Sequence, residues 1–338
     1  MKLLRKFLLP LTWLYALILS LRNLFYDLGI FASKQFSVPV ICVGNLSMGG
    51  TGKSPTIEYL IRLLKNQYHV ATLSRGYGRK TKGFVSLDAS NEAVEVGDEP
   101  LQFKNKFPEI EVAVDELRAH GIQKILEDKN TEVILLDDAF QHRKVQAGFT
   151  ILLSVYNDLY VNDFVLPAGN LREPKSGAKR ADIIIITKCP PSLSEKEQTQ
   201  IRLQLNLQKH QKVFFSYIAY QKEAQGLNSK IKLSELQNYT LVTGIANPKP
   251  LVDFLNEINP PQKHLKFKDH HNFSASEINI MRQERIILTT EKDFTRLKTS
   301  LASDQLFYIP IEMKILDHAE GFNHAILNYV AEFASTES

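Results

Sequence analysis

The chain contains 338 residues, of which 44% are hydrophobic and 23% charged, and its formal net charge is +4 at pH 7. This composition is typical of a globular protein, excludes a disordered chain, and allows two domains that bury their cores without disulfides. The mild charge and the two cysteines argue against a nucleic-acid-binding protein, a disulfide framework and a cysteine metal site, so we expect a reducing, cytoplasmic setting.

The N-terminal segment combines basic side chains with an uncharged apolar run. This run covers residues 7–21, is shorter than the ~20 apolar residues that a membrane-spanning helix needs, and contains Pro10. We predict that residues 1–30 form a membrane-associated helix in the lipid interface, with Trp13 and Tyr15 at the boundary. Two alternatives stay open: a helix packed on the protein's own core, and a cleaved signal peptide, although no small-x-small site precedes Arg22.

Beyond residue 37, short apolar runs alternate with amphipathic helical stretches. Several runs are apolar throughout, which is typical of strands buried on both faces of a parallel sheet. The predicted strands cover residues 38–43, 69–73, 111–114, 133–136, 150–153 and 183–186, with crossover helices at 57–64 and 116–126. Further strands at 213–217, 241–243, 286–289 and 307–309 follow a polar stretch at 190–211. We therefore predict a doubly wound, mostly parallel α/β core over 31–205 and a smaller α/β lobe over 206–338.

A glycine-rich loop follows the first of these strands and leads directly into a helical pattern. The order of strand, loop, Gly-Lys-Ser and helix is the context of a P-loop, which makes the core P-loop NTPase-like. In such a loop, backbone N–H groups and the helix N-terminus converge on phosphate oxygens. Lys53 is expected to reach the outer phosphates, and the Ser54 hydroxyl is expected to bind Mg²⁺. The predicted nucleotide-binding residues are Gly49, Gly50, Thr51, Gly52, Lys53 and Ser54.

The loop departs from two related patterns. Ser47 stands where the strict P-loop pattern has its first glycine. Met48 stands where partition-type ATPases carry an additional lysine, which argues against that class.

An acidic pair, Asp137 and Asp138, ends the apolar strand at 133–136. A buried strand that delivers carboxylates at its C-terminal end is the expected second half of a phosphate site, because Mg²⁺ prefers oxygen ligands. Which of the two carboxylates touches the metal stays open. The chain also carries shorter polar motifs, each weak when taken singly: 74–79 (SRGYGR), 97–100 (GDEP), 171–174 (LREP) and 269–271 (DHH).

Taken together and in this order, the motifs resemble those of the tetraacyldisaccharide 4′-kinases, which phosphorylate the lipid A disaccharide precursor in Gram-negative bacteria. The resemblance rests on VPVICVGN, GGTGKSP, LSRGYGR, GDEP, LLDDAFQHR, PAGNLREP, VTGIANP, FKDHHNF and LTTEKD, and extends over residues 38–293. Ala139 and Phe140 stand where the family often has Gly and Leu.

The resemblance implies roles for further residues. Asp98 is expected to be the catalytic base, and His270, in preference to His271, its partner. Arg172 is expected to bind the nucleotide, and Glu173 to join Ser54, Asp137 and Asp138 in the metal site. Residues 242–248 are expected to contact the nucleotide from the second lobe.

The implied reaction moves the γ-phosphoryl group of ATP, with Mg²⁺, to the 4′-hydroxyl of a lipid-linked disaccharide. The expected location is the cytoplasmic face of the bacterial inner membrane, with the membrane surface as a partner, no nucleic acid and no obligate protein partner. The main alternative is a membrane-associated, nucleotide-driven switch or assembly ATPase without a small-molecule acceptor. A GTP-dependent metallochaperone and a kinase for a soluble metabolite are weaker alternatives.

Overall fold

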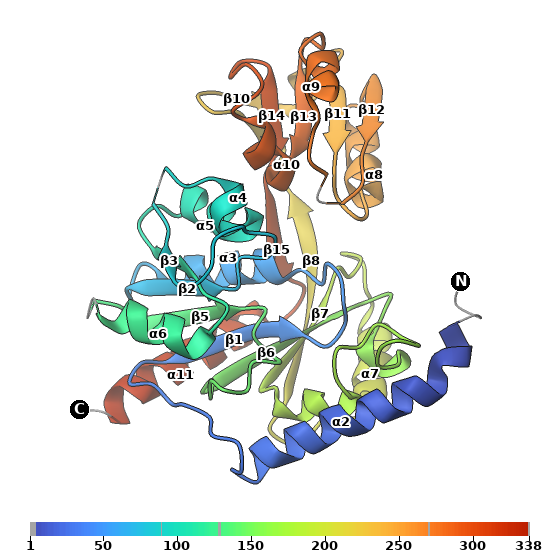
Figure 1. Cartoon of the computed structure of the whole chain (residues 1–338). Coiled ribbons are helices and arrows are strands. Elements are labelled where there is room, and N and C mark those ends of the chain that lie inside the picture. Colours follow the sequence, from blue (N-terminus) through green and yellow to red (C-terminus); the bar gives the residue numbers. More distant parts are fainter. Residues whose placement is uncertain (1–4, 89, 128–129, 270, 337–338) are drawn as a thin grey trace.

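Two β-sheets organise the chain. The structure is a computed structural model that describes residues 5–88, 90–127, 130–269 and 271–336. Figure 1 shows a large lobe below and a small lobe above, joined by the long strands β8 (Lys212–Tyr220) and β15 (Ile311–Ile315).

The sheet of the large lobe has nine strands in the order β15-β8-β7-β6-β1-β5-β2-β4-β3. Its strands besides β8 and β15 are β1 (Val40–Asn45), β2 (Val70–Ser74), β3 (Val85–Ser86), β4 (Glu111–Val114), β5 (Val133–Asp137), β6 (Phe149–Val155) and β7 (Ile183–Thr187). The two edge strands, β3 and β15, are antiparallel to their neighbours, and the others run parallel. In the pairing of β1 with β5, Val43 lies opposite Asp137, so both strands end at the same edge of the sheet.

Helices cover both faces of this sheet. The side chains of α3 (Lys53–Leu64) and α11 (Ala319–Thr336) share one buried cluster with alternate residues of the strands. The other face packs against α6 (Arg118–Glu127) and α7 (Glu195–Leu205). Two short helices, α4 (Ala93–Val96) and α5 (Asp98–Lys106), lie beneath the small lobe in Figure 1. The 3-10 helices are η1 (Lys6–Leu8), η2 (Tyr160–Asn162), η3 (Lys175–Arg180) and η4 (Leu233–Glu235).

The small lobe is a six-stranded sheet in the order β10-β9-β14-β13-β11-β12. Its strands are β9 (Glu223–Gln225), β10 (Lys230–Lys232), β11 (Thr240–Thr243), β12 (Lys263–Lys266), β13 (Ile287–Thr290) and β14 (Leu306–Ile309). Leu251 and Leu255 of α8 (Lys249–Ile258) pack on one face. Side chains of α9 (Ala275–Met281) and α10 (Glu291–Leu297) pack on the other. The lobe therefore has a core of its own.

The predicted fold class is confirmed, but the predicted domain boundary at 205/206 needs correction. After the small lobe, the chain returns to the large sheet as β15, and α11 then packs on that sheet through Phe322, Ile326 and Val330. The small lobe is thus an insertion between two neighbouring strands. The polar stretch at 190–211 also forms α7, whose N-terminus carries a capping box made by Ser194 and Glu197.

The N-terminal helix α2 (Leu9–Asp27) lies along the lower side of the large lobe in Figure 1. The two buried residues of this helix, Thr12 and Asn23, are both polar, while Trp13, Leu14 and Leu17 are each more than half exposed. Ala16 and Leu19 are half-buried against the core, and the larger apolar side chains of the helix face away from the protein. Within the described residues, no helix combines the length and apolarity needed to cross a bilayer.

Candidate phosphoryl-transfer site

The glycine-rich loop lies between the end of β1 at Asn45 and the start of α3 at Lys53. Gly49 and Gly52 have φ angles of 112° and 91°, which residues with a Cβ rarely adopt. Gly52 is also the N-cap of α3, so this backbone conformation directs the loop into the helix N-terminus. The predicted order of strand, glycine-rich loop and helix is present, and it has the geometry that favours phosphate binding.

The end of β7 braces this loop. The Thr187 hydroxyl donates to the carbonyl oxygen of Thr51 over 2.8 Å, and Lys188 Nζ donates to that of Gly50 over 2.6 Å. Burial lowers the pKa of Lys188, and the nearby Asp269 opposes this effect. Because Asp269 belongs to the small lobe, its influence on Lys188 indicates that the two lobes converge above the loop.

The acidic pair lies beside the loop at the end of β5. Asp137 is buried, and its Oδ1 has no hydrogen-bond partner among the described residues. Burial is the main cause that raises the pKa of Asp137 to about 7, with Lys53 opposing it and Asp138 and Glu99 adding to it. A buried carboxylate oxygen without a protein partner next to a phosphate loop fits a position for a divalent cation.

Asp138 has a different environment. Its φ of 50° places it in the left-handed region. Its Oδ1 lies 2.7 Å from Arg172 Nη2 and 3.7 Å from Lys53 Nζ. Burial works against ionisation, but Lys53 and Arg172 outweigh it and lower the pKa of Asp138. Asp138 is therefore held as a carboxylate between two cations.

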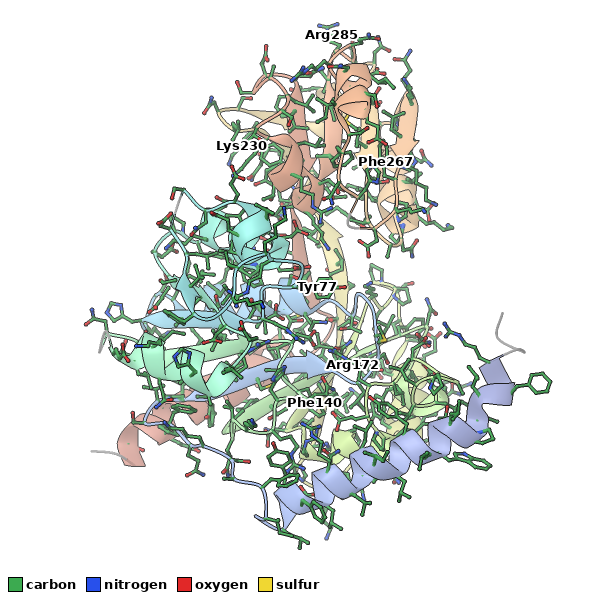
Figure 2. All side chains as sticks on the ribbon, viewed as in Figure 1. Tyr77, Phe140, Arg172, Lys230, Phe267 and Arg285 are labelled. Atoms are coloured by element: carbon green, nitrogen blue, oxygen red, sulfur yellow. The ribbon has the colours of Figure 1, made fainter. Side chains whose placement is uncertain are left out.

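Asn45 joins these groups from the end of β1. Its Oδ1 accepts a hydrogen bond from Arg172 Nη2 and lies 3.5 Å from Lys53 Nζ. The backbone N–H of Arg172 donates to the carbonyl oxygen of Leu46 over 2.7 Å, and Figure 2 shows Arg172 beside the end of β1. The structure thus brings together the predicted Lys53, Asp138 and Arg172. Asn45 was not predicted, because a lone asparagine at a strand end carries no distinguishing pattern.

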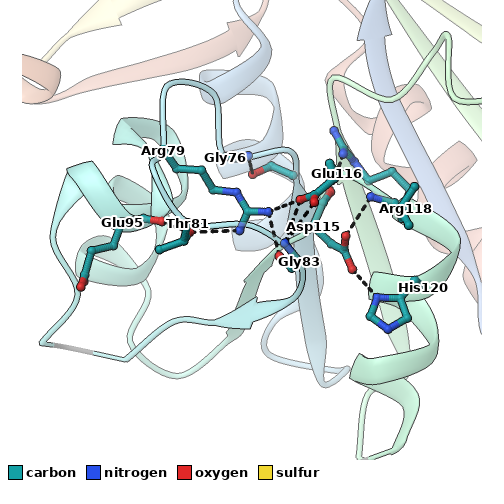
Figure 3. Close-up of polar contacts among 11 residues, drawn as sticks. Gly76, Arg79, Thr81, Gly83, Glu95, Asp115, Glu116, Arg118 and His120 are labelled. Atoms are coloured by element: carbon teal, nitrogen blue, oxygen red, sulfur yellow. Dashed lines mark hydrogen bonds and ion pairs between the residues drawn. The ribbon is translucent and has the colours of Figure 1, made fainter.

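Arg118 is a second residue of the site that was not predicted from the sequence. It is 2% exposed at the start of α6, and its Nε and Nη2 have no partner among the described residues. Burial lowers its pKa to about 10, and Asp137 and Asp138 oppose this effect. In Figure 3 its Nη1 points to the Asp115 backbone oxygen, a contact of 2.6 Å. A buried guanidinium with unused N–H groups next to the acidic pair is a candidate for binding an anion.

The two arginines of the 74–79 motif lie in different environments. Arg79 forms an ion pair with Glu116, which also accepts from the backbone N–H of Gly83 over 3.0 Å (Figure 3). Arg79 therefore stabilises its own loop, whereas Arg75 and Tyr77 are exposed.

Burial, followed by the charges of Arg118 and Arg75, lowers the pKa of His142 to about 4, so His142 is neutral at physiological pH.

Glu173 does not lie where its predicted role as a metal ligand requires. Its carboxylate is 1% exposed and accepts from Arg180 over 2.9 Å, from Gln141 over 2.9 Å and from Asn23 over 3.0 Å. Both of its oxygens are thus used by protein donors, one of which comes from α2. In this arrangement Glu173 fixes the N-terminal helix to the loop after β5, and we correct its predicted role as a metal ligand.

The predicted base lies where the two lobes meet. Asp98 is the first residue of α5, and Arg296 of α10 contacts both of its carboxylate oxygens, with Nε donating to Oδ1 over 3.0 Å. The predicted partner His270 lies outside the described residues. His271, the alternative, directs its Nε2 to Glu277 over 3.0 Å and stacks on Phe267. His271 is therefore engaged within the small lobe.

The doubly wound sheet, the glycine-rich loop and the acidic strand end define a P-loop nucleotide-binding protein. The model of the family "Tetraacyldisaccharide-1-P 4'-kinase" matches residues 4–331. The "Tetraacyldisaccharide 4'-kinase" of Flavobacterium johnsoniae is 51% identical over 338 residues, which cover 98% of this chain and 99% of the relative. That of Bacteroides thetaiotaomicron is 42% identical over 355 residues, with 97% and 93% covered.

A solved structure is similar over the same length. It is the crystal structure of "apo" form LpxK from Aquifex aeolicus in complex with ATP, which matches with a TM-score of 0.79 and 30% sequence identity, covering 97% of this chain and 99% of that one. The chain therefore belongs to the tetraacyldisaccharide-1-P 4′-kinase family.

Proposed function

We propose that this chain transfers the γ-phosphoryl group of ATP to the 4′-hydroxyl of a tetraacylated glucosamine disaccharide 1-phosphate, a step of lipid A biosynthesis. The observation that carries this proposal is the family match over residues 4–331, within which the phosphate loop and the acidic strand end are both complete. Phosphoryl transfer depends mainly on positioning and on charge neutralisation, and the site offers groups for both.

The nucleotide phosphates are assigned to the loop and its cations. The loop offers the backbone N–H groups of Gly49, Gly50, Thr51 and Gly52. Lys53 and Arg172 lie at the end of the loop, where both contact Asp138. Arg118 supplies further positive charge next to the acidic pair. These cations are expected to offset the charge of the transferred group.

Mg²⁺ is assigned to the Ser54 hydroxyl and the acidic pair, with Asp137 as the preferred carboxylate. The donor set fits a hard cation, since Asp137 Oδ1 is buried without a protein partner, whereas Asp138 is already paired with Arg172. When bound, Mg²⁺ neutralises phosphate charge. Glu173 is left out of this set because Arg180, Gln141 and Asn23 occupy its oxygens.

Asp98 is assigned the role of the base that accepts the proton of the 4′-hydroxyl, with His270 as its partner. Its place at the lobe junction supports this role, and so does the influence of the neighbouring Glu99 on the pKa of Asp137, which puts the start of α5 close to the acidic pair. Base assistance of this kind is worth about 10²–10⁴-fold in rate.

The N-terminal helix is assigned to the membrane surface. α2 contacts the protein through polar groups and two half-buried apolar side chains. Thr12 accepts from the backbone N–H of Ala168 over 3.0 Å, Asn23 donates to Glu173, and Ala16 and Leu19 pack on the core. The larger apolar side chains of the helix point outwards, which suits a helix that lies in the lipid interface beside a lipid substrate. We place the protein on the cytoplasmic face of the bacterial inner membrane, with neither nucleic acid nor an obligate protein partner.

The test is transfer of radiolabelled γ-phosphate in detergent micelles, with the tetraacylated disaccharide 1-phosphate as acceptor. Wild type is expected to label the lipid, and Lys53→Ala is expected to lose the activity. Nucleotide hydrolysis without labelled lipid would instead favour a membrane-associated, nucleotide-driven switch. Flotation with vesicles, compared with a variant that lacks the exposed apolar side chains of α2, tests the assignment to the membrane.

A further inference from the structure

Arg296 connects the two lobes at the position of the predicted base. It lies on α10 of the small lobe, and its Nε and Nη2 donate to the two carboxylate oxygens of Asp98 on the large lobe. Both side chains are only 12% exposed. Two parallel N–H···O bonds fix the plane of a carboxylate as well as its position, which a single point charge does not do.

The same guanidinium also holds a third segment. Arg296 Nη1 donates to the backbone oxygen of His271 over 3.0 Å, so it fixes the loop that precedes α9. On its other side, this loop is anchored by the His271 ring, which contacts Glu277 and stacks on Phe267. Arg296 therefore joins α10, the start of α5 and the loop that carries the 269–271 motif.

Other ion pairs hold α5 against α10 independently of Arg296. Lys292 Nζ lies 3.3 Å from Glu99 Oε1. Lys106 Nζ lies 2.7 Å from Glu58 and 2.9 Å from Glu291. Because these contacts already join the helices, the paired hydrogen bonds from Arg296 to Asp98 are not needed merely to keep the lobes together.

We propose that Arg296 is a positioning residue for phosphoryl transfer: it orients the Asp98 carboxylate and fixes the neighbouring loop of the small lobe. The base then has its working geometry only while α10 is docked on α5. This inference rests on the proposed role of Asp98 and extends it to a residue on the other lobe. A base that rotates freely loses much of its effect, because proton transfer needs a heavy-atom contact of about 2.6–3.2 Å.

The first test compares Arg296→Gln, Arg296→Lys and wild type in the micelle assay. Arg296→Gln is expected to lower kcat about 100-fold, at the lower end of the effect of base catalysis. KM for ATP is expected to stay within about twofold, since the nucleotide is assigned to the loop and its cations. Arg296→Lys is expected to be faster than Arg296→Gln but slower than wild type, because lysine keeps the positive charge but cannot form both parallel hydrogen bonds. Lys292→Met is the matched control and is expected to stay near wild type.

The second test is a double-mutant cycle with Asp98→Ala. If Arg296 acts through Asp98, the double variant is no slower than Asp98→Ala alone. Additive losses, a wild-type kcat for Arg296→Gln, or equal losses in Lys292→Met would overturn the inference. Full activity of Asp98→Ala would instead remove the base role itself. Circular dichroism checks folding; if Arg296→Gln does not fold, Arg296→Lys decides, with about a tenfold loss in kcat expected and an unchanged kcat refuting the inference.

Discussion

A buried pair of glutamates at the lobe junction makes stability depend on pH in a direction that is open to test. Glu291, the first residue of α10, faces Glu58 of α3 across Lys106. Burial, followed by the charge of Glu58, raises the pKa of Glu291 to about 7. Between the unfolded pKa and this value, the folded protein keeps a proton that the unfolded chain has released. The free energy of unfolding therefore falls as pH rises through this range.

Replacing Glu291 with glutamine fixes the neutral form and removes this dependence. The pKa rises from 4.5 to about 7, and one pKa unit corresponds to about 1.4 kcal/mol. We combine the titration of Glu291 in the folded protein with that in the unfolded chain. The free energy of unfolding of Glu291→Gln, relative to wild type, is then expected to rise by about 2–3 kcal/mol from pH 5 to pH 8. Any constant effect of the substitution cancels, because only the change between the two pH values is used.

Urea titrations followed by far-ultraviolet circular dichroism measure this difference. Fluorescence is less suitable, because the single tryptophan, Trp13, lies exposed on α2. Glu223→Gln, an exposed position on β9, makes the same charge change and is expected to show no such gain. If the free energy of unfolding differs between Glu291→Gln and wild type by the same amount at both pH values, the reasoning is refuted. If Glu291→Gln instead becomes less stable relative to wild type from pH 5 to pH 8, Lys106 stabilises the ionised form of Glu291.

Three further predictions test the site, the membrane surface and the core. Asp98→Ala is expected to reduce transfer to lipid by about 10²–10⁴-fold, with nucleotide binding near wild type in a calorimetric titration; unchanged transfer would remove Asp98 from the base role. Leu14→Asp with Leu17→Asp on the exposed side of α2 is expected to weaken vesicle binding at least about tenfold without lowering the melting temperature, whereas a lowered melting temperature would place these side chains in the core. Leu60→Ala, in the fully buried row of α3, is expected to cost about 2–5 kcal/mol in urea unfolding, and a smaller loss would mean that the neighbouring side chains close the cavity.

The architecture of the large sheet could be predicted because its strands are buried on both faces. Runs such as 183–186 are apolar throughout, and the glycine-rich loop marks the strand-to-helix transition beside them. Short edge strands were missed. β3 has two residues and β10 three, too few for a periodic pattern to be recognised.

The lobe boundary depends on long-range pairing, which a single sequence does not encode locally. Nothing in residues 311–315 shows that they pair with β8 rather than with the strand that precedes them. Likewise, α11 is amphipathic, but its pattern does not say which sheet it covers. The C-terminal segment was therefore predicted to belong to the lobe nearest in the chain.

Motif order placed Lys53, Asp137, Asp138 and Arg172 together, and the structure brings them to one edge of the sheet. The roles of Asn45, Arg118 and Arg296 depend on partners distant in sequence, so their contacts were not readable. The family resemblance also implied that Glu173 is a metal ligand. In the structure, however, its carboxylate accepts a hydrogen bond from Asn23 of α2, a contact between distant residues that the motif does not indicate.

The insertion of the small lobe between β8 and β15 also sets an order on synthesis. The phosphate loop leaves the ribosome early, but α11, which supplies Phe322, Ile326 and Val330 to the face shared with α3, is made only after the whole small lobe. A nascent chain can therefore complete the small lobe while the large one still exposes an apolar face. We expect such chains to need protection by chaperones until α11 has left the ribosome, because exposed apolar surface drives aggregation during folding.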